Sequence, residues 1–547
     1  MTRNYTNDSG GGLLEMAAAA QARARSSALA LHGLNDMQRE AVTATEPRLL
    51  ILSGAGTGKT RALTHRVVHL ITERGVNPGR ILAVTFTNKA AGEMRERVAH
   101  LLDEAGAAVT TRPTLATFHS FAARLLRRWA ETLGVRGIDR DFSIYDADDS
   151  LRTVKALLKE AGIGKEALAP RTVADRISRA KNAGVFAADF PASPFAECYR
   201  GEDIAKLYAA YEERLTRQNA LDFDDLLLRC VQLLRERANV RERLSSYLTE
   251  FLVDEWQDTN SLQLEFVRLL SSVHGKLWAV GDDDQSIYGW RSADIRHVLD
   301  FAQHFPGARI IRLEQNYRST PNILSASGAL VSRNKGRLGK TLWTAAPAGA
   351  PVRVYEADSG DGEAEYVADR IADLLTEPTG EVPVAAVLYR TNAQSLAFEE
   401  ALRRRSIAYR IVGGMSFFER MEVKDMMSYL AVAANGEDRA AFERAVGTPA
   451  RGLGEKTLAK IYARAEATGR GLWATLKEEA EAARAASSKA APSPCGLARP
   501  AAQKLAEFVA LVERAREYAA RGEVSKLVGH FIEQSGYGCL VDFPLLL

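Results

Sequence analysis

The sequence predicts an α/β fold in which a parallel sheet is interrupted by an inserted helical domain. Short apolar runs at residues 49–53, 81–86 and 251–253 each end in polar residues, and a helical pattern follows the first two. This rhythm of strand, turn and helix is typical of a parallel sheet that helices cover. Residues 130–219, by contrast, are mostly amphipathic helix with few strand signals.

Composition limits the class of protein. The chain has 547 residues, 46% hydrophobic and 26% charged, as in globular proteins of roughly three to four domains. A net charge of +3 does not by itself indicate nucleic acid. The four cysteines are far apart without a C-x-x-C pair, which argues against a zinc site, an iron–sulfur cluster or disulfides. No apolar run reaches the roughly 20 residues of a membrane span and no secretory signal is recognisable, so we expect a cytoplasmic protein with no membrane partner.

Residues 1–31 are poor in large apolar side chains and are predicted to be a flexible tail, although a frayed helix or a targeting peptide also fits them. Asn35 or Asp36 can then cap a helix that runs through Val42. Gln38 lies in this helix. Its amide is either a plain surface group or, because it carries a donor and an acceptor, a reader of an adenine edge.

The stretch LLILSGAGTGKT, residues 49–60, reads as a buried strand, a glycine-rich loop and the start of a helix. Loop amides and a helix N-terminus favour a polyphosphate, Lys59 supplies charge for the β- and γ-phosphates, and the Thr60 hydroxyl can bind Mg²⁺. A strict G-x-x-x-x-G-K-[ST] motif has glycine where this chain has Ser53, so a chance glycine-rich turn is the alternative. The candidate nucleotide-binding residues of the loop are Gly54, Ala55, Gly56, Thr57, Gly58, Lys59 and Thr60.

Two further strand ends carry candidate ligand-binding residues. The second apolar run ends in Phe86, and Asn88 opens the next helix, so both lie where ligands of parallel sheets bind. Residues 114–117 repeat the pattern and lead through His119 into a basic helix at 124–129, which also fits an ordinary solvated face.

Asp254 and Glu255 end the apolar run at 251–253. One carboxylate can hold Mg²⁺, directly or through water, and the next can orient and deprotonate an attacking water; helix capping is the alternative role of such a pair. Asp254 follows Lys59 by 195 residues (254 minus 59), far more than one P-loop unit needs, which predicts the inserted helical domain.

One more apolar strand leads into a loop that carries Gln285, Tyr288, Trp290 and Arg291. Two aromatic rings beside glycine and arginine, on a loop rather than on a core face, suit the stacking of unpaired bases.

Taken in order, these segments resemble the motifs of the UvrD/Rep/PcrA family of superfamily-1 DNA helicases. They are LNDMQREAV, SGAGTGKTR, VTFTNKAAGEM, TFHSFAARLLR, LDFDDLL, LVDEWQDTN, VGDDDQSIYGWRSA, LEQNYRST, VLYRTNAQSLAFEEAL and VGGMSFFERMEVKD. The resemblance covers residues 34 to about 454, and this family often lacks glycine at the position of Ser53. One such motif is weak evidence, whereas ten in series are very specific.

The resemblance implies a role for each matched residue, although the pair Tyr317 and Arg318 alone would also fit an exposed loop. At the nucleotide, Gln38 would read adenine, Tyr317 would stack on it, and Lys59, Thr60 and Arg61 would hold phosphate and metal. Asp254 would serve Mg²⁺, Glu255 would be the general base, Gln285 would sense the γ-phosphate and Arg318 would be an arginine finger. The single-strand path would be lined by Phe86, Asn88, His119, Tyr288, Trp290 and Arg291.

The family implies two RecA-like domains with ATP between them, each carrying an inserted helical domain. We expect a first RecA-like domain at 32–112 and 220–310, its insertion at 113–219, the N-terminal part of a second RecA-like domain at 311–430 and a partial insertion at 431–547. Residues 485–502 are a low-complexity loop or linker. Two later family motifs, a T-x-H-x-x-K-G-type segment and one bearing a second arginine finger, do not occur in the 547 residues, so the second RecA-like domain is expected to lack its returning half.

The resemblance implies an enzyme that hydrolyses ATP with Mg²⁺, moves 3′ to 5′ on single-stranded DNA and unwinds duplex at single–double-strand junctions, in DNA repair. The alternative is a truncated module that binds ATP and single-stranded DNA without efficient turnover. A helicase–nuclease relative would need a nuclease domain, for which the chain has no room.

Overall fold

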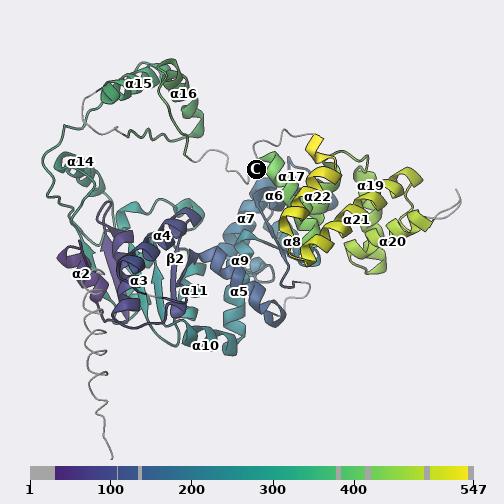
Figure 1. The fold of residues 1–547 in the computed structure, drawn as a ribbon, viewed down its shortest axis with the longest axis horizontal. Helices are drawn as coiled ribbons and strands as arrows, with labels where there is room; N and C mark the ends of the chain where they lie inside the picture. Colours follow the sequence, from purple (N-terminus) through teal and green to yellow (C-terminus); the bar gives the residue numbers. More distant parts are fainter. Residues whose placement is uncertain are drawn as a thin grey trace, which may run out of the picture. The chain divides into compact units, whose positions relative to one another are not determined.

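The computed structural model of the chain describes residues 31–107, 109–133, 138–376, 384–412, 420–485 and 493–539. The predicted tail, apart from Leu31, lies outside these residues, as do 486–492 of the predicted linker and the apolar end from residue 540. The chain divides into two compact units, one of residues 1–348 with 425–547 and one of residues 349–424 (Figure 1).

The larger unit is built on a six-stranded sheet in which every strand pair is parallel (Figure 1). The strand order is β3-β2-β6-β7-β1-β8, and Leu50 of β1 aligns with Ala279 of β7 on one side and Ile310 of β8 on the other. The α/β fold with a parallel sheet is therefore confirmed. The strands are β1 (Arg48–Ser53), β2 (Ile81–Thr85), β3 (Thr114–Thr117), β6 (Glu250–Val253), β7 (Leu277–Gly281) and β8 (Arg309–Leu313).

Both faces of this sheet are buried, because successive residues of a strand point to opposite sides and helices cover each side. In β1, Leu50 and Leu52 belong to one apolar cluster, whereas Leu49 and Ile51 belong to another. The first cluster contains side chains of α5 (Phe118–Leu133), α9 (Phe223–Glu236) and α11 (Ser261–Leu270). The second contains side chains of α2 (Asp36–Thr43), α3 (Lys59–Thr72) and α4 (Asn88–Glu104).

Several helices begin with the capping chemistry that the sequence contains. Of the two candidate caps of α2, Asn35 is the one used, and it forms a capping box with Gln38. Thr87 caps α4 by accepting a hydrogen bond from the Ala90 backbone N–H at 3.1 Å. Both caps place the first helical turn at the edge of the sheet where the strands end.

The chain between β3 and β6 builds a second, mainly helical core. Val173, Ile177 and Tyr208 are among its buried side chains. Two strands of three residues each also pair here in parallel, with Ile144 beside Leu221. The elements of this core are β4 (Ser143–Tyr145), α6 (Ala147–Glu160), α7 (Pro170–Asn182), α8 (Gly201–Arg217) and β5 (Ala220–Asp222). The helix before β6, α10 (Ala238–Tyr247), instead buries Val240 in the first apolar cluster of the large sheet.

The strand β8 belongs to the first sheet, next to β1. Because β8 pairs with β1, it straddles the boundary at 310/311 that the sequence predicts between two RecA-like domains. Trp343 and Gln315 form an isolated parallel bridge further along. Short helices flank the strand: α12 (Arg296–Leu299), α13 (Phe301–His304) and α14 (Pro321–Val331).

A helical bundle forms the last described part of the larger unit, with Tyr429, Phe442 and Phe531 in its core. The Asn435 amide Nδ2 donates to the carbonyl oxygens of Gln218 and Asn219 at 3.1 Å each, which ties the bundle to β5. Within the described ranges, no helix has the length and apolar character needed to cross a membrane. The bundle comprises α17 (Met421–Ala434), α18 (Arg439–Gly447), α19 (Glu455–Thr468), α20 (Leu472–Ala485), α21 (Arg499–Ala520) and α22 (Val524–Gln534).

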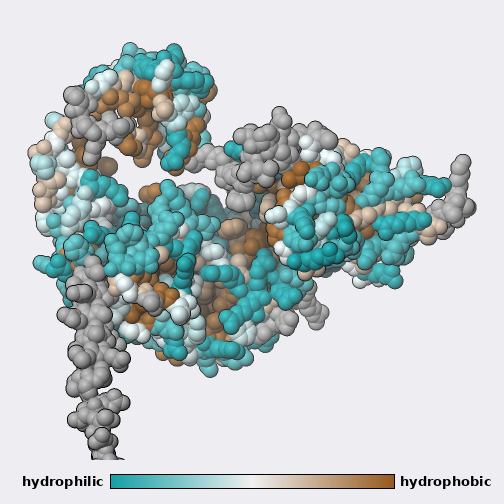
Figure 2. All heavy atoms as spheres, in the orientation of Figure 1, coloured by the Kyte–Doolittle hydropathy of each residue, from teal (hydrophilic) through white to brown (hydrophobic). Residues whose placement is uncertain are grey.

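The smaller unit packs α15 (Gly360–Thr376) against α16 (Ser395–Arg404) through a small apolar core. No strand forms among its described residues, and the segments at 350–356 and 384–389 have no regular structure. Val354 is 95% exposed and Val384 96%. Figure 2 shows hydrophobic surface beside the two helices of this unit.

Candidate nucleotide and nucleic-acid sites

The glycine-rich loop lies at the carboxyl end of β1 and leads into α3. Gly56 (φ 70°) and Gly58 (φ 83°) adopt left-handed conformations that glycine reaches at little cost, and Gly58 caps α3. Ser53, where a strict motif would have glycine, is buried and donates its hydroxyl to the carbonyl oxygen of Gly281 on β7 at 3.2 Å. The serine thus links two neighbouring strands below the loop.

Lys59 and Glu255 meet at the carboxyl ends of β1 and β6. The Lys59 ammonium lies 2.8 Å from Oε2 of Glu255, and the same oxygen accepts a hydrogen bond from Gln257 Nε2 at 2.8 Å. Glu255 has a left-handed backbone (φ 51°), which is strained for a residue with a side chain. This conformation turns the carboxylate towards the start of α3.

Asp254, the neighbour of Glu255, is buried at the end of β6. Burial and the charge of Glu255 raise the pKa of Asp254 to about 7, and Lys59 offsets only part of this effect. A divalent cation beside Asp254 would supply the missing positive charge. Thr60, in the first turn of α3, offers a hydroxyl of the kind that binds Mg²⁺ in such loops. The residues present therefore fit Mg²⁺.

The segment after β8 contacts the loop directly. The Asn316 amide Nδ2 donates to the Ala55 carbonyl at 2.6 Å, and the Tyr317 backbone N–H donates to the Gly56 carbonyl at 2.9 Å. A Cβ added to Gly56 would lie 2.7 Å from Cβ of Arg318, so Arg318 begins next to the loop. Arg318, the predicted arginine finger, therefore starts next to the glycine-rich loop of residues 53–60, which we call the phosphate cradle.

The adenine candidates also lie together. The hydroxyl of Tyr317 accepts a hydrogen bond from Asn35 Nδ2 at 2.7 Å, and Asn35 caps the helix that carries Gln38. Gln38 is only 2% exposed, donates to the Thr57 carbonyl at 2.8 Å and so supports the loop from below. The Arg61 guanidinium lies against Gly33, on the same side of the loop.

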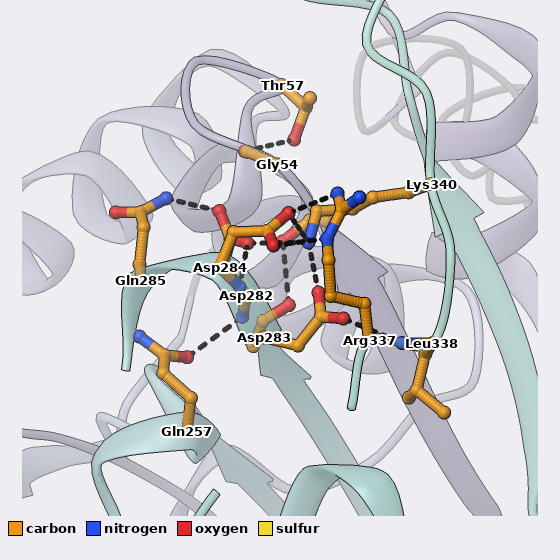
Figure 3. Close-up of polar contacts among 12 residues, drawn as sticks. Gly54, Thr57, Gln257, Asp282, Asp283, Asp284, Gln285, Arg337, Leu338 and Lys340 are labelled. Carbon is orange, nitrogen blue, oxygen red and sulfur yellow. Dashed lines mark hydrogen bonds and ion pairs between the residues drawn. The ribbon is translucent and has the colours of Figure 1, made fainter. Parts of the chain in front are cut away.

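Gln285 belongs to a short turn after β7 and donates through Nε2 to Asp282 (Figure 3). The Asp282 backbone N–H in turn donates to Gln257 Oε1 at 2.9 Å. Gln257 therefore connects the loop after β6, which carries Glu255, to the loop after β7.

A cavity of about 650 Å³ opens beside these two loops. The rings of Phe86 and Tyr288 stack with centroids 5.3 Å apart, and the Arg291 guanidinium lies 4.4 Å from the centre of the Trp290 ring. Trp290 is 67% exposed. The residues that line the cavity are Thr85, Phe86, Phe118, His119, Asp175, Ser178, Arg179, Asn182, Phe223, Asp224, Asp258, Asn260, Gln263, Trp290, Arg291 and Ser292.

Two polar atoms at this cavity have their hydrogen-bonding capacity unused among the described residues. Thr85 Oγ1 and Asp258 Oδ1 are buried and have no hydrogen-bond partner within the described part of the chain. Burial lowers the pKa of His119 to about 4, so its ring, which lies 5.0 Å from that of Phe223, is neutral at neutral pH. Asn88 is exposed in the first turn of α4 and is not part of the cavity lining.

Comparison with known proteins identifies the family. The UvrD/REP helicase N-terminal domain matches residues 34–306, and the UvrD-like helicase C-terminal domain matches residues 311–483. Over 513 residues, 93% of this chain and 67% of the relative, the sequence is 39% identical to the ATP-dependent DNA helicase PcrA of Staphylococcus epidermidis. The chain belongs to the UvrD-like helicase family.

Other relatives agree with this assignment and confirm the resemblance that the ordered motifs indicate. DNA helicase II of Escherichia coli K12 is 44% identical over 464 residues, 84% of this chain and 63% of the relative. PcrA of Bacillus subtilis is 40% identical over 448 residues, 82% of this chain and 59% of the relative. The chain spans about three-fifths of the length of these two UvrD-like helicases.

Within this UvrD-like chain, the structure also places residues that the sequence analysis did not single out. Phe223, Asn182 and Asn260 line the cavity, and Asn260 Nδ2 donates to Asn182 Oδ1 at 2.8 Å. Phe223 lies in the matched motif LDFDDLL, so the motif itself was the available signal. Asn316 lies beside the predicted Tyr317, but nothing local in the sequence reveals its contact with Ala55.

Proposed function

We propose that this chain is a UvrD-type DNA helicase that hydrolyses ATP with Mg²⁺ to move 3′ to 5′ on single-stranded DNA and to unwind duplex in DNA repair. The observation that carries the proposal is the contact of Lys59 with Glu255 beside the buried Asp254, next to a cavity with exposed aromatic rings. The direction of movement and the repair role rest on the family alone.

Nucleotide binding changes the partner of Lys59. In the structure its ammonium neutralises Glu255. The phosphates of ATP carry more negative charge than one carboxylate, so they would attract Lys59 and leave Glu255 free to accept a proton from an attacking water. Glu255 thus acts as a base only when a polyphosphate occupies the loop.

The other residues of the site would hold the metal, contact the nucleotide and stabilise the transition state of hydrolysis. Asp254 and Thr60 would hold Mg²⁺, which neutralises phosphate charge when bound. Gln285 would contact the γ-phosphate, and Arg318, next to Gly56, would stabilise charge that develops in the transition state. Tyr317 would stack on the adenine near Gln38.

Two loops supply the coupling to DNA. The loop after β6 carries Glu255 and also Asp258 of the cavity, and the loop after β7 carries Gln285 and also Trp290. A nucleotide-dependent shift of either loop therefore moves groups that would contact single-stranded DNA.

Lys59→Ala tests the proposal, with the exposed Lys89→Ala as control. DNA-stimulated ATPase activity should vanish in the first variant and persist in the second, while circular dichroism stays unchanged in both. Equal ATPase activity of the wild-type and Lys59→Ala proteins would refute the assignment of the phosphate cradle. A wild-type chain that binds ATP and single-stranded DNA but shows no turnover would favour the alternative of a binding module.

A further inference from the structure

Three consecutive aspartates, Asp282, Asp283 and Asp284, follow β7, and one carboxylate oxygen of each lies within 4.8 Å of the others (Figure 3). Three carboxylates this close together repel one another unless a cation lies between them. Here the cation is Lys340, whose ammonium lies 2.7 Å from Asp282 Oδ1 and 2.9 Å from Asp284 Oδ2, and also pairs with Asp283. The Lys340 side chain is 1% exposed. A lysine from a distant part of the chain thus fills the cluster.

Asp282 connects this lysine to Gln285. Its Oδ1 pairs with Lys340, while its Oδ2 accepts the hydrogen bond from Gln285 Nε2. Its backbone N–H is held by Gln257, which also contacts Glu255. The orientation of the Gln285 amide therefore depends on a carboxylate that Lys340 fixes.

We propose that Lys340 is a positioning residue of the ATP site, which holds Asp282 and, through Asp282, directs Gln285 towards the γ-phosphate. This inference rests on the proposed function, because it takes Gln285 as the residue that contacts that phosphate. In this role Lys340 acts through Asp282 and Gln285 rather than on the nucleotide itself.

The geometry distinguishes Lys340 from its neighbour Arg337. Of the three aspartates, Arg337 forms its ion pair within the described residues with Asp284, with Nε 2.6 Å from Oδ1 and an Nη 2.8 Å from Oδ2. Within the described residues, the Gln285 amide Nε2 donates to Asp282 and not to Asp284. Arg337 therefore contributes charge to the cluster without touching the carboxylate that orients Gln285.

Loss of Lys340 has two effects that must be separated. One is general, because three buried or half-buried carboxylates would lose a shared cation and the turn would be destabilised. The other is specific, because Asp282 could then rotate and release Gln285 from its position. Within the described residues, the Asp283 carboxylate accepts from the Leu338 backbone N–H and from Lys340 rather than from Gln285, so Asp283→Asn removes repulsion without repairing the orientation.

The test compares Lys340→Met, Arg337→Met and the double variant Lys340→Met/Asp283→Asn in the full chain. Equilibrium titration with fluorescent ADP and with a non-hydrolysable fluorescent ATP analogue gives two dissociation constants for each protein. Only the ATP analogue carries the γ-phosphate, so a positioning role appears in the ratio of the two constants rather than in ADP binding.

We expect Lys340→Met to weaken binding of the ATP analogue about tenfold, the effect of a lost hydrogen bond to a charged group, with ADP binding unchanged. Arg337→Met should leave the ratio of the two dissociation constants unchanged. The double variant should regain thermal stability, but its ratio should stay at the value of Lys340→Met. In a Gln285→Ala background, Lys340→Met should have no further effect on the ratio.

The proposal is overturned if Lys340→Met and Arg337→Met change the ratio equally, if the double variant restores the ratio, or if Lys340→Met still changes it without Gln285. Failure of the proposed function looks different. In that case the wild-type and Lys59→Ala proteins would give the same ratio of the two dissociation constants.

Discussion

Glu255 illustrates how one strained residue builds the ATP site. A side chain in the left-handed region costs roughly 1–3 kcal/mol and persists only where surrounding contacts hold it. Here Lys59 and Gln257 each bind the same carboxylate oxygen. The strain therefore directs the carboxylate to the phosphate cradle rather than along the strand.

Glu255→Gln should keep this shape and remove the base. We expect the variant to bind ATP but to hydrolyse it about 10²–10⁴-fold more slowly, the usual contribution of a general base. Single-turnover hydrolysis and nucleotide titration measure the two quantities. A variant that no longer binds ATP would indicate a structural role for Glu255 instead.

At Trp290, a substitution should weaken DNA binding without changing the stability of the fold. Because stacking of a base on an aromatic ring contributes roughly 1–3 kcal/mol, Trp290→Ala should weaken single-strand binding about 10- to 100-fold with little sequence dependence. Its ring is 67% exposed, so the melting temperature should hardly change.

The matched control is Tyr199→Ala, whose ring is 77% exposed before α8 and does not line the cavity. Fluorescence anisotropy with labelled oligonucleotides should show wild-type affinity for this control. Equal loss of affinity in both variants would argue against a stacking role specific to Trp290.

At the scale of elements, Lys181 joins α8 of the inserted helical domain to β5 and α9, which follow it in the chain. This lysine of α7 is fully buried, and its ammonium lies 2.7 Å from Glu212 of α8, 2.7 Å from Asp222 at the end of β5 and 2.8 Å from Asp225 of α9. These carboxylates raise the pKa of Lys181 despite its burial, so it remains charged. The helices are therefore held by one shared cation.

Lys181→Met should be strongly destabilising, because breaking a buried ion cluster leaves uncompensated charges at a cost of about 3–5 kcal/mol. Lys155→Met, at an exposed position of α6, should stay within about 0.5 kcal/mol of wild type. Urea unfolding followed by circular dichroism compares the midpoints. Similar midpoints for both variants would show that the cluster adds nothing to stability.

The elements also show which features the sequence could predict. The loop after β1 and the acidic pair after β6 were predictable, because each depends on residues adjacent in the chain. The helical insertion was predictable from the long sequence separation of Lys59 and Asp254. The pairing of β8 with β1 was not, since nothing local distinguishes a strand that closes the first sheet from one that opens a second. Asn316 and Lys340 were missed for the same reason: their partners, Ala55 and Asp282, are distant in sequence.

For the candidate site the same division holds. The sequence predicted that Gln285, Tyr288 and Trp290 share one loop. In the structure, Gln285 contacts the aspartate cluster, Trp290 lines the cavity, and Tyr288 lies next to Trp290. Asn88 remains a prediction without support from the cavity lining. The roles assigned to individual residues in ATP and DNA binding stay predictions until the variants are measured.

At the scale of the whole molecule, the two units should differ in local stability. Segments 350–356 and 384–389 lack strand pairing in the smaller unit, and Leu388 is 89% exposed. Amides without hydrogen bonds open at almost no free-energy cost. Hydrogen exchange followed by mass spectrometry should therefore be fast in these segments and slow in β1 and β7. Strong protection of residues 384–389 would contradict this expectation.

The position of β1 between β7 and β8 also affects how the protein is made. Leu313, which pairs with Ser53, follows it by 260 residues (313 minus 53). At synthesis rates of about 5–20 residues per second, the strand that carries the phosphate cradle emerges roughly 13–52 s before its second neighbour exists. During that interval the backbone N–H and C=O groups on this edge of β1 remain unpaired, which is the condition under which a strand pairs with another chain instead of its own sheet.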